Sequence, residues 1–127
     1  MNVRFGSRKV MILDDHILDV MQAESALRKG GYEVVKMSSP NGVMAKLDYE
    51  RPEILLLDVT MERVNVRGIL DAVRLSHDHE DLIVVLFSDL EAEELQEWCR
   101  EHDIHGYYCK SMDISKVPEF LDNFYEE

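Results

Sequence analysis

Five polar side chains of this chain stand directly after runs of apolar residues, and their types fit one chemistry. They are Asp14, Asp15, Asp58, Ser88 and Lys110. Carboxylates gathered in one place repel one another, so they favour a hard divalent cation, and oxygen ligands suit Mg²⁺, which keeps several of its waters. A cation that also holds a phosphoryl oxygen allows a carboxylate to attack phosphorus. With the ammonium of Lys110 and the hydroxyl of Ser88 on the other phosphoryl oxygens, the set predicts an acyl phosphate formed on an aspartate.

The apolar runs before these residues predict strands that are buried on both faces. The predicted strands span residues 10–13, 32–37, 54–57, 82–87 and 105–109. Apolar residues at helical spacing follow each strand. The first predicted helix begins at Ile17 and ends at Gly30-Gly31. The second begins with Ser39 as its cap and Pro40 as its first residue. The other three cover about residues 67–76, 91–102 and 117–124.

Strand and helix alternate five times along the chain, which predicts a doubly wound α/β fold with a parallel sheet between two layers of helices. We expect the strand order 2-1-3-4-5, with two helices on one face and three on the other. Ligand sites of such sheets form at the carboxyl ends of the strands, so the polar residues above should converge on one rim. The patternless start predicts a tail over residues 1–8, followed by a single domain over residues 9–127.

Composition narrows the range of partners. The formal net charge of −12, from 26 acidic and 14 basic side chains, repels phosphate backbones and anionic lipid, so we expect neither direct nucleic-acid binding nor membrane binding. The charge either serves solubility alone or faces a partner with a basic docking surface. Cys99 and Cys109 form no CxxC pair and predict buried, inert thiols in a reducing cytosol. With no apolar run near ~20 residues and no signal peptide, the predicted location is the cytoplasm.

Four motifs together resemble the receiver (response-regulator) domains of two-component signalling, from Lys9 to about Tyr125. The motifs are KVMILDD, LLLDVTM, VVLFS and YYCK, in the family's order and spacing. The resemblance implies a flavodoxin-like (βα)5 fold with Asp58 as the phosphoacceptor and Mg²⁺ as the cofactor. For the metal, it implies Asp15, Asp58 and the backbone carbonyl of Thr60 as direct Mg²⁺ ligands, with Asp14 holding metal-bound water. For the phosphoryl group, it implies Lys110 as the phosphate-binding lysine and Ser88 as the hydroxyl that moves toward the phosphate. It also implies Tyr107 as the aromatic residue whose orientation follows the switch.

The chain departs from the family's pattern around the acceptor. Glu62 stands where proline is usual after the methionine, and Gly68 comes later than the family's glycine, which predicts a longer acceptor loop. Ser111 replaces the proline that commonly follows the lysine, and we expect a trans bond there because a non-proline cis bond costs about 2.5–4 kcal/mol. Thr60 occupies a position that tunes hydrolysis in the family.

Asp89 is the fourth departure, because the family usually has a small residue directly after the hydroxyl residue. Its carboxylate could oppose and crowd the incoming phosphoryl group, place a water for hydrolysis, or start the fourth helix. If it faces the donor, we expect it to slow phosphorylation, since repulsion over ~4–6 Å is on the order of 1 kcal/mol even at a high effective dielectric constant.

Several of these residues also fit ordinary structural roles. Asp14 and Asp15 suit the N-terminus of a helix through its dipole, Ser88 suits the N-cap of the fourth helix, and Tyr107 suits a strand aromatic. His16, beside the acid pair, predicts a loop or helix-start residue rather than a metal ligand, because no second histidine lies nearby in the sequence.

The interpretation that joins these features is a phosphorylation-dependent signalling switch. A histidine kinase or phosphotransfer protein would donate to Asp58, and the fourth helix, fifth strand and fifth helix would then rearrange and bind a downstream protein differently. We expect a monomer or weak dimer that dephosphorylates itself and is not a turnover enzyme. The main alternative is a receiver-fold interaction module that signals without phosphorylation. A phosphatase is the enzyme-class alternative, but a second aspartate would be needed at Thr60.

Overall fold

The computed structural model describes residues 8–125, which form one five-stranded parallel sheet in the order β2-β1-β3-β4-β5. The strands are β1 (Lys9–Leu13), β2 (Glu33–Met37), β3 (Ile54–Leu57), β4 (Ile83–Ser88) and β5 (Gly106–Cys109). The predicted strand order is confirmed. The order reverses its direction between β1 and β3, so a crevice is expected at the carboxyl ends of these two strands.

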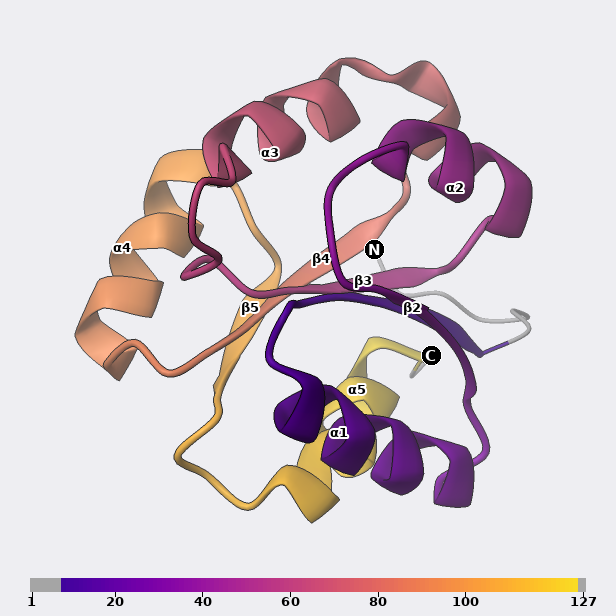
Figure 1. Ribbon diagram of the computed structural model, residues 1–127, viewed down its shortest axis with the longest axis vertical. Helices are drawn as coiled ribbons and strands as arrows, with labels where there is room; N and C mark the ends of the chain where they lie inside the picture. The colour runs from indigo at the N-terminus through magenta and orange to yellow at the C-terminus, as the bar shows by residue number, and fades with distance from the viewer. Residues whose placement is uncertain (1–7, 126–127) are drawn as a thin grey trace.

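Helices cover both faces of the sheet, as predicted. They are α1 (Ile17–Lys29), α2 (Val43–Glu50), α3 (Val66–Leu75), α4 (Ala92–His102) and α5 (Val117–Asp122), with 3₁₀ turns at His77–His79, Ile114–Lys116 and Asn123–Tyr125. Figure 1 shows α1 and α5 side by side on one face of the sheet and α2, α3 and α4 on the other. Within residues 8–125, no helix is long and apolar enough to cross a bilayer.

The central strands separate two hydrophobic cores, because successive side chains of a strand point to opposite faces. Met11 and Leu13 of β1 pack into the core under α2, α3 and α4. Val10 and Ile12 of the same strand pack into the core under α1 and α5. This two-sided burial explains why the strands appear in the sequence as continuous apolar runs rather than alternating ones.

The start of α2 differs from the prediction. The helix begins at Val43, and its cap residue Gly42 has a left-handed backbone with φ of 75°. Ser39 and Pro40 form a turn instead: the hydroxyl of Ser39 accepts a hydrogen bond from the backbone N–H of Asn41 at 3.2 Å, and the carbonyl of Pro40 accepts one from Val43. A serine that bonds to its own neighbouring backbone competes with helix formation there, and the glycine makes the left-handed turn possible.

Local hydrogen bonding at the start of α3 explains the position of Gly68 after the loop between β3 and α3. Gly68 lies inside the first turn of α3 rather than in the loop, and its N–H donates to the capping side chain of Asn65 at 3.0 Å. A Cβ at position 68 would lie only 2.7 Å from Asn65 Nδ2. The glycine therefore makes room for the helix cap, and the loop turns earlier, at Arg63, whose φ is 59°.

The predicted tail is only partly open to comparison, because residues 1–7 lie outside the described residues. Arg8, its last residue, is anchored: a guanidinium nitrogen lies 2.7 Å from Asp122, and its backbone N–H donates to Glu53 at 2.9 Å. The guanidinium also lies over the rings of Tyr32 and Tyr125, at 5.2 Å and 4.7 Å from their centroids. Arg8 therefore belongs to the folded domain rather than to a tail.

Candidate functional site

Strand ends bring the predicted acids and the lysine together at one edge of the sheet. Asp14 follows β1, Asp58 follows β3 and Lys110 follows β5, and all three side chains are buried. The ammonium nitrogen of Lys110 lies 2.8 Å from Asp14 Oδ2 and 3.4 Å from Asp58 Oδ2. Two carboxylates and one cation thus share a small buried space, while Asp15 stands at its exposed side.

Each of the two buried carboxylates is fixed by a turn of its own backbone. Asp14 Oδ1 accepts a hydrogen bond from the backbone N–H of His16 at 2.9 Å. Asp58 Oδ1 accepts two from Thr60, one from the backbone N–H at 2.9 Å and one from the hydroxyl at 2.8 Å. Turns of this kind are typical of aspartate. They hold one oxygen of each residue and leave the other, Oδ2, facing Lys110.

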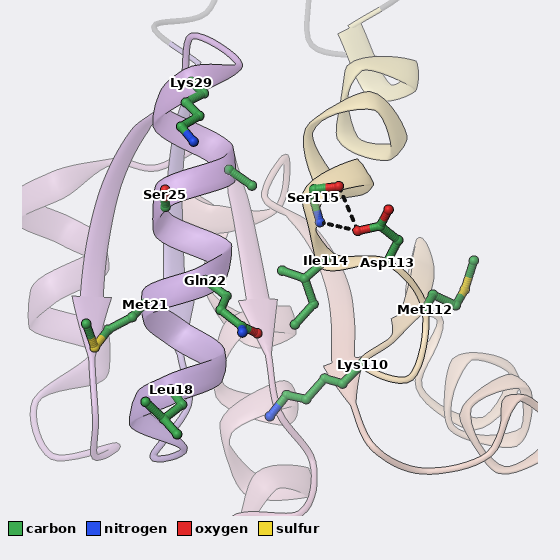
Figure 2. Close-up of a pocket in the computed structure, with 11 residues that line it drawn as sticks. Leu18, Met21, Gln22, Ser25, Lys29, Lys110, Met112, Asp113, Ile114 and Ser115 are labelled. Carbon is green, nitrogen blue, oxygen red and sulfur yellow. Dashed lines mark hydrogen bonds between the residues drawn. The ribbon is translucent and has the colours of Figure 1, made fainter.

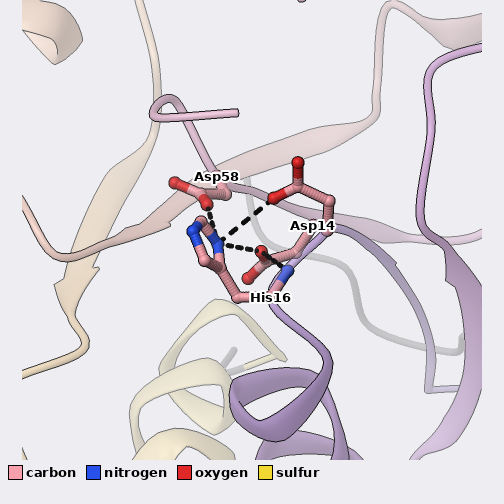
Figure 3. A group of neighbouring side chains, drawn as sticks. Asp14, His16 and Asp58 are labelled. Atoms are coloured by element: carbon pink, nitrogen blue, oxygen red, sulfur yellow. Dashed lines mark hydrogen bonds and ion pairs between the residues drawn. The ribbon is translucent and has the colours of Figure 1, made fainter. Parts of the chain in front are cut away.

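Asp14 and Asp15 do not cap α1, because the N-cap residue is His16. Of the two positions expected for His16, a loop or a helix start, the structure shows the helix start, but its ring was not expected in the acidic cluster. Its Nδ1 atom lies 2.8 Å from Asp14 Oδ1, 2.8 Å from Asp58 Oδ2 and 3.3 Å from Asp15 Oδ1. Figure 3 shows the ring between Asp14 and Asp58. The only signal in the sequence was that His16 adjoins the acid pair.

Lys110 is held by a third carboxylate that the sequence analysis missed. Asp19, in the first turn of α1, places Oδ2 at 3.0 Å from the ammonium nitrogen. Burial alone would lower the pKa of Lys110, but the carboxylates of Asp14, Asp19 and Asp58 outweigh burial and raise it. The lysine therefore keeps its positive charge at neutral pH. Since α1 begins at this edge of the sheet, an acid in its first turn was a possible contact.

The two buried aspartates differ in their affinity for protons. Burial opposes the charge of Asp58, but the hydrogen bonds from Thr60 and the nearby charge of Lys110 outweigh it, and the pKa of Asp58 lies below its ordinary value. At Asp14 burial dominates, and it raises the pKa despite the contacts with Lys110 and His16. Of the two, Asp58 therefore binds a proton less readily, which suits a carboxylate that acts as a nucleophile.

The donor set fits a hard divalent cation. One ligand atom from each of Asp14, Asp15, His16 and Asp58 lies within 4.8 Å of all the others. Asp14 Oδ2 is buried and accepts no hydrogen bond from the described residues, although Lys110 contacts it as an ion pair. Buried carboxylate oxygens in such numbers need positive charge beyond one lysine. Mg²⁺ would be held by Asp15 and Asp58 and would supply positive charge at phosphoryl oxygens.

Ser88 and Tyr107 lie near this edge but outside the cluster. Ser88 is buried at the end of β4, and its hydroxyl accepts a hydrogen bond from the backbone N–H of Leu90 at 3.3 Å. It does not cap α4, whose N-cap residue is Glu91. The hydroxyl of Tyr107 accepts a hydrogen bond from the side-chain amide of Gln96 on α4 at 3.0 Å. Among the described residues, no hydrogen bond or ion pair joins either residue to the acidic cluster.

The structure also places Asp89 and Ser111, two positions where the sequence departs from the pattern of the family it resembles. Asp89 is exposed in the turn after β4, and because α4 begins at Ala92 with Glu91 as its cap, Asp89 does not start the helix. The two other roles suggested for Asp89, restraint of phosphorylation and placement of a water for hydrolysis, stay predictions. The bond between Lys110 and Ser111 is trans, as expected, since residues 8–125 contain no cis peptide bond.

An open cleft lies beside the acidic cluster, between α1 and the segment that joins β5 to α5. Its volume is about 760 Å³, and Lys110 lies at its inner end (Figure 2). Leu18 on α1 and Met112 after β5 line it with side chains that are 75% and 54% exposed. The cleft joins an apolar surface to the charged site.

Comparisons with known proteins agree on one family. Residues 10–122 match the family model described as the response regulator receiver domain. Protein PilH of Pseudomonas aeruginosa is 25% identical over 109 residues, which cover 83% of this chain and 87% of that protein. The chemotaxis response regulator CheY4 of Vibrio cholerae has a similar structure, with a TM-score of 0.81 at 19% identity over 94% of this chain and 99% of that chain.

A further structural relative carries a metal. It is the receiver domain of a sensor histidine kinase from Pseudomonas aeruginosa, solved with a magnesium ion coordinated in its active-site cleft. Its TM-score is 0.79 at 13% identity, over 94% of this chain and 98% of that chain. At these identities the likeness of the two solved structures establishes the fold.

Proposed function

The chain belongs to the response regulator receiver domain family, and from this premise we propose that it is a phosphorylation-dependent signalling switch with Asp58 as its phosphoacceptor. One observation carries the proposal. The carboxylate of Asp58 is fully buried, has a pKa below its ordinary value, is fixed through Oδ1 by Thr60 and is directed through Oδ2 toward Lys110 at 3.4 Å. A nucleophile held in one orientation beside a cation is prepared for attack on an anionic phosphoryl group.

The transfer itself needs little from the protein beyond position and charge. A carboxylate oxygen of Asp58 forms a bond to the phosphorus of a phosphohistidine, and the bond from phosphorus to the histidine nitrogen breaks with its electron pair. Lys110 then leaves its contacts with Asp14 and Asp19 to bind a phosphoryl oxygen. The hydroxyl of Ser88, which now accepts a hydrogen bond from Leu90, turns to donate to the phosphoryl group.

The response to transfer involves α4 and β5. Ser88 ends β4 and stands next to the turn into α4, while Tyr107 of β5 is tied to α4 through Gln96. Movement of the Ser88 hydroxyl and rotation of Tyr107 would break ties that hold this conformation, and both states then exist in an equilibrium that phosphorylation shifts. The surface formed by α4, β5 and α5 would present the change to a downstream protein.

The donor would be a histidine kinase or phosphotransfer protein, and its approach is suggested by the cleft beside Lys110. The exposed apolar side chains of Leu18 and Met112 line that cleft, and Ile17 and Met21 on α1 are also more than half exposed. Exposed apolar surface next to a reaction centre is typical of a protein-binding site. The chain would act as a cytoplasmic monomer or weak dimer that dephosphorylates itself without turning over an external substrate.

The test is covalent labelling by acetyl phosphate with Mg²⁺, followed by intact-mass measurement. The wild type should gain one base-labile phosphoryl group, and Asp58→Asn should gain none. Asp71→Asn, which removes an exposed acid on α3, is the matched control and should be labelled like the wild type. Removal of Mg²⁺ with a chelator should abolish labelling of the wild type and of Asp71→Asn.

Two results would contradict the proposal. Equal labelling of wild type and Asp58→Asn would place the acceptor elsewhere. Failure of the wild type to accept a phosphoryl group from acetyl phosphate and from histidine kinases would instead support an interaction module that signals without phosphorylation.

A further inference from the structure

The nitrogen of His16 lies at ligand spacing from the carboxylates of the site. Two ligands that bind one ion at about 2.1 Å and at right angles lie about 3 Å apart. The separations from His16 Nδ1 are 2.8 Å to Asp14 Oδ1, 2.8 Å to Asp58 Oδ2 and 3.3 Å to Asp15 Oδ1. The imidazole nitrogen therefore lies among the carboxylates at a spacing that one bound ion would require (Figure 3).

Hydrogen bonding accounts for these contacts only while Nδ1 of His16 carries a proton. Nδ1 carries either one proton or one lone pair. If it carries a proton, it can share that proton between the two carboxylates at 2.8 Å, while the ammonium of Lys110 donates to the carboxylates of Asp14, Asp19 and Asp58. If it carries a lone pair, Lys110 can donate to it, but both carboxylates face that lone pair with no positive charge between them. A cation bound among these atoms removes the conflict of the second case.

The side chain of His16 is not needed to start α1. The residue is the N-cap of α1, but its side chain makes no capping hydrogen bond. Its ring is partly exposed, with 42% of the side chain accessible, so it can be removed without leaving a cavity in the core.

We propose that His16 is a nitrogen ligand of the metal site, so that this receiver domain binds a borderline transition-metal ion such as Ni²⁺ or Co²⁺ more tightly than Mg²⁺ through its imidazole. The inference rests on the proposed function in that it uses the same acidic site. Carboxylate, carbonyl and water ligands suit Mg²⁺, whereas imidazole suits Ni²⁺, Zn²⁺, Cu²⁺ and Fe²⁺. A single imidazole added to the oxygen set therefore changes which metal the site selects while leaving the Mg²⁺ ligands in place.

Calorimetric titration with Ni²⁺ and, separately, with Mg²⁺ at one fixed pH tests the inference. The proteins are the wild type, His16→Ala, His16→Asn and the control His77→Ala. The side chain of His77 is 99% exposed in the 3₁₀ turn His77–His79. Loss of a ligand should weaken Ni²⁺ binding about tenfold or more in both His16 variants. Mg²⁺ binding should change little in these variants, and the control should bind both ions like the wild type.

The visible spectrum of the Co²⁺-loaded protein gives a second measurement that does not depend on affinity. Loss of a nitrogen ligand in His16→Ala should change the absorption bands, and His77→Ala should leave them as in the wild type. Circular dichroism verifies that the variants are folded, and His16→Asn keeps a polar side chain if His16→Ala is unstable.

Two outcomes would overturn the inference. Unchanged Ni²⁺ affinity in both His16 variants would show that the ring is not a ligand. Tighter binding of Mg²⁺ and Ni²⁺ alike would show that the ring occupies the position of the ion and must leave before a metal binds. Neither outcome contradicts the assignment of Asp58 as the phosphoacceptor, because Mg²⁺-dependent labelling of Asp58 in the same variants tests the proposed function separately.

Discussion

The chemistry of single residues depends on how each charged atom is held. Asp58 receives two hydrogen bonds on one oxygen and faces Lys110 with the other. Lys110 in turn is shared among Asp58, Asp14 and Asp19, at 3.4, 2.8 and 3.0 Å. In the unphosphorylated protein the lysine is therefore held closer to the two carboxylates that are not the acceptor.

Asp19 should restrain phosphorylation by holding Lys110 on the α1 side of the site. Asp19→Asn removes one negative partner, so Lys110 becomes freer to bind the phosphoryl group. An ion pair with one partly exposed member is worth about 0.2–1 kcal/mol, which corresponds to a rise of up to about fivefold in the phosphorylated fraction. Intact-mass measurement under steady labelling by acetyl phosphate gives this fraction. Asp71→Asn is the control, and an unchanged or smaller fraction in Asp19→Asn would show that Asp19 only neutralises the lysine.

At the scale of elements, the pairing of β5 with β4 sets the position of Lys110. The backbone N–H of Lys110 donates to the carbonyl of Ser88 at 2.8 Å, which continues the ladder one residue past the strand. At the other end of β5, His105 exchanges two hydrogen bonds with Val84: its N–H donates to the Val84 carbonyl at 3.1 Å, and its Nδ1 accepts from the Val84 N–H at 3.1 Å. This edge strand is thus fixed at both ends.

The contact of His105 should make the stability of the domain fall in mild acid. Burial and the charge of Arg74 lower the pKa of His105, and Asp103 opposes them only in part. The unfolded chain therefore binds a proton more readily than the folded one, so stability contributed by neutral His105 is present above its ordinary pKa and is lost as the pH falls through the folded pKa. A protonated Nδ1 also can no longer accept from Val84.

Urea unfolding at pH 7 and at lower pH measures this effect. The midpoint of the wild type should fall more steeply with decreasing pH than that of His105→Asn, which keeps an acceptor near the Nδ1 position but does not titrate. His77→Ala, which removes an exposed histidine, should follow the wild type. Parallel pH profiles for wild type and His105→Asn would mean that His105 titrates normally in the folded state.

At the scale of the whole molecule, the two edges of the sheet have different roles. The carboxyl edge carries the closely spaced charges of Asp14, Asp58 and Lys110, which suit the binding of a cation and a phosphoryl group. The amino edge carries a compact polar cluster, defined by Arg8, Tyr32, Glu53, Asp122 and Tyr125. In this cluster the hydroxyl of Tyr125 donates to Glu53 at 2.6 Å, and the hydroxyl of Tyr32 donates to Asp122 at 2.8 Å. These contacts join residues before β1 and β3 to the end of α5.

Loss of a single hydroxyl from this cluster should lower stability and leave the chemistry unchanged. Tyr125→Phe removes the hydrogen bond to Glu53 and should cost about 1 kcal/mol in the free energy of unfolding. Tyr49→Phe is the matched control, because that side chain is 83% exposed and its change should stay within about 0.5 kcal/mol. Urea unfolding measures both, and acetyl phosphate labelling should be equal in the two variants. An unchanged free energy of unfolding in Tyr125→Phe would indicate that aromatic packing alone holds the turn Asn123–Tyr125 in place.

The sequence by itself determined the fold and the strand-end residues of the site, but not Asp19 or the ring of His16. Apolar runs followed directly by Asp14, Asp58 and Lys110 are local features, and in a parallel sheet the carboxyl ends of strands must share one edge. Strand order and the division of helices between the two faces followed from the alternation of elements and are confirmed. Local side-chain bonding was harder to foresee, and it explains why Ser39 and Pro40 form a turn before α2 rather than its first residues.

Only the tertiary structure decided which side chains meet. His16 and Asp19 reach the site because α1 starts at its edge, and Arg8 meets Asp122 across nearly the whole length of the chain. Such contacts depend on the angle at which a helix leaves the sheet and on the rotamer of a long side chain, and neither leaves a periodic signal in the sequence. Strand ends are specified by local hydrophobicity, whereas contacts between distant residues are specified by the packing of the completed fold.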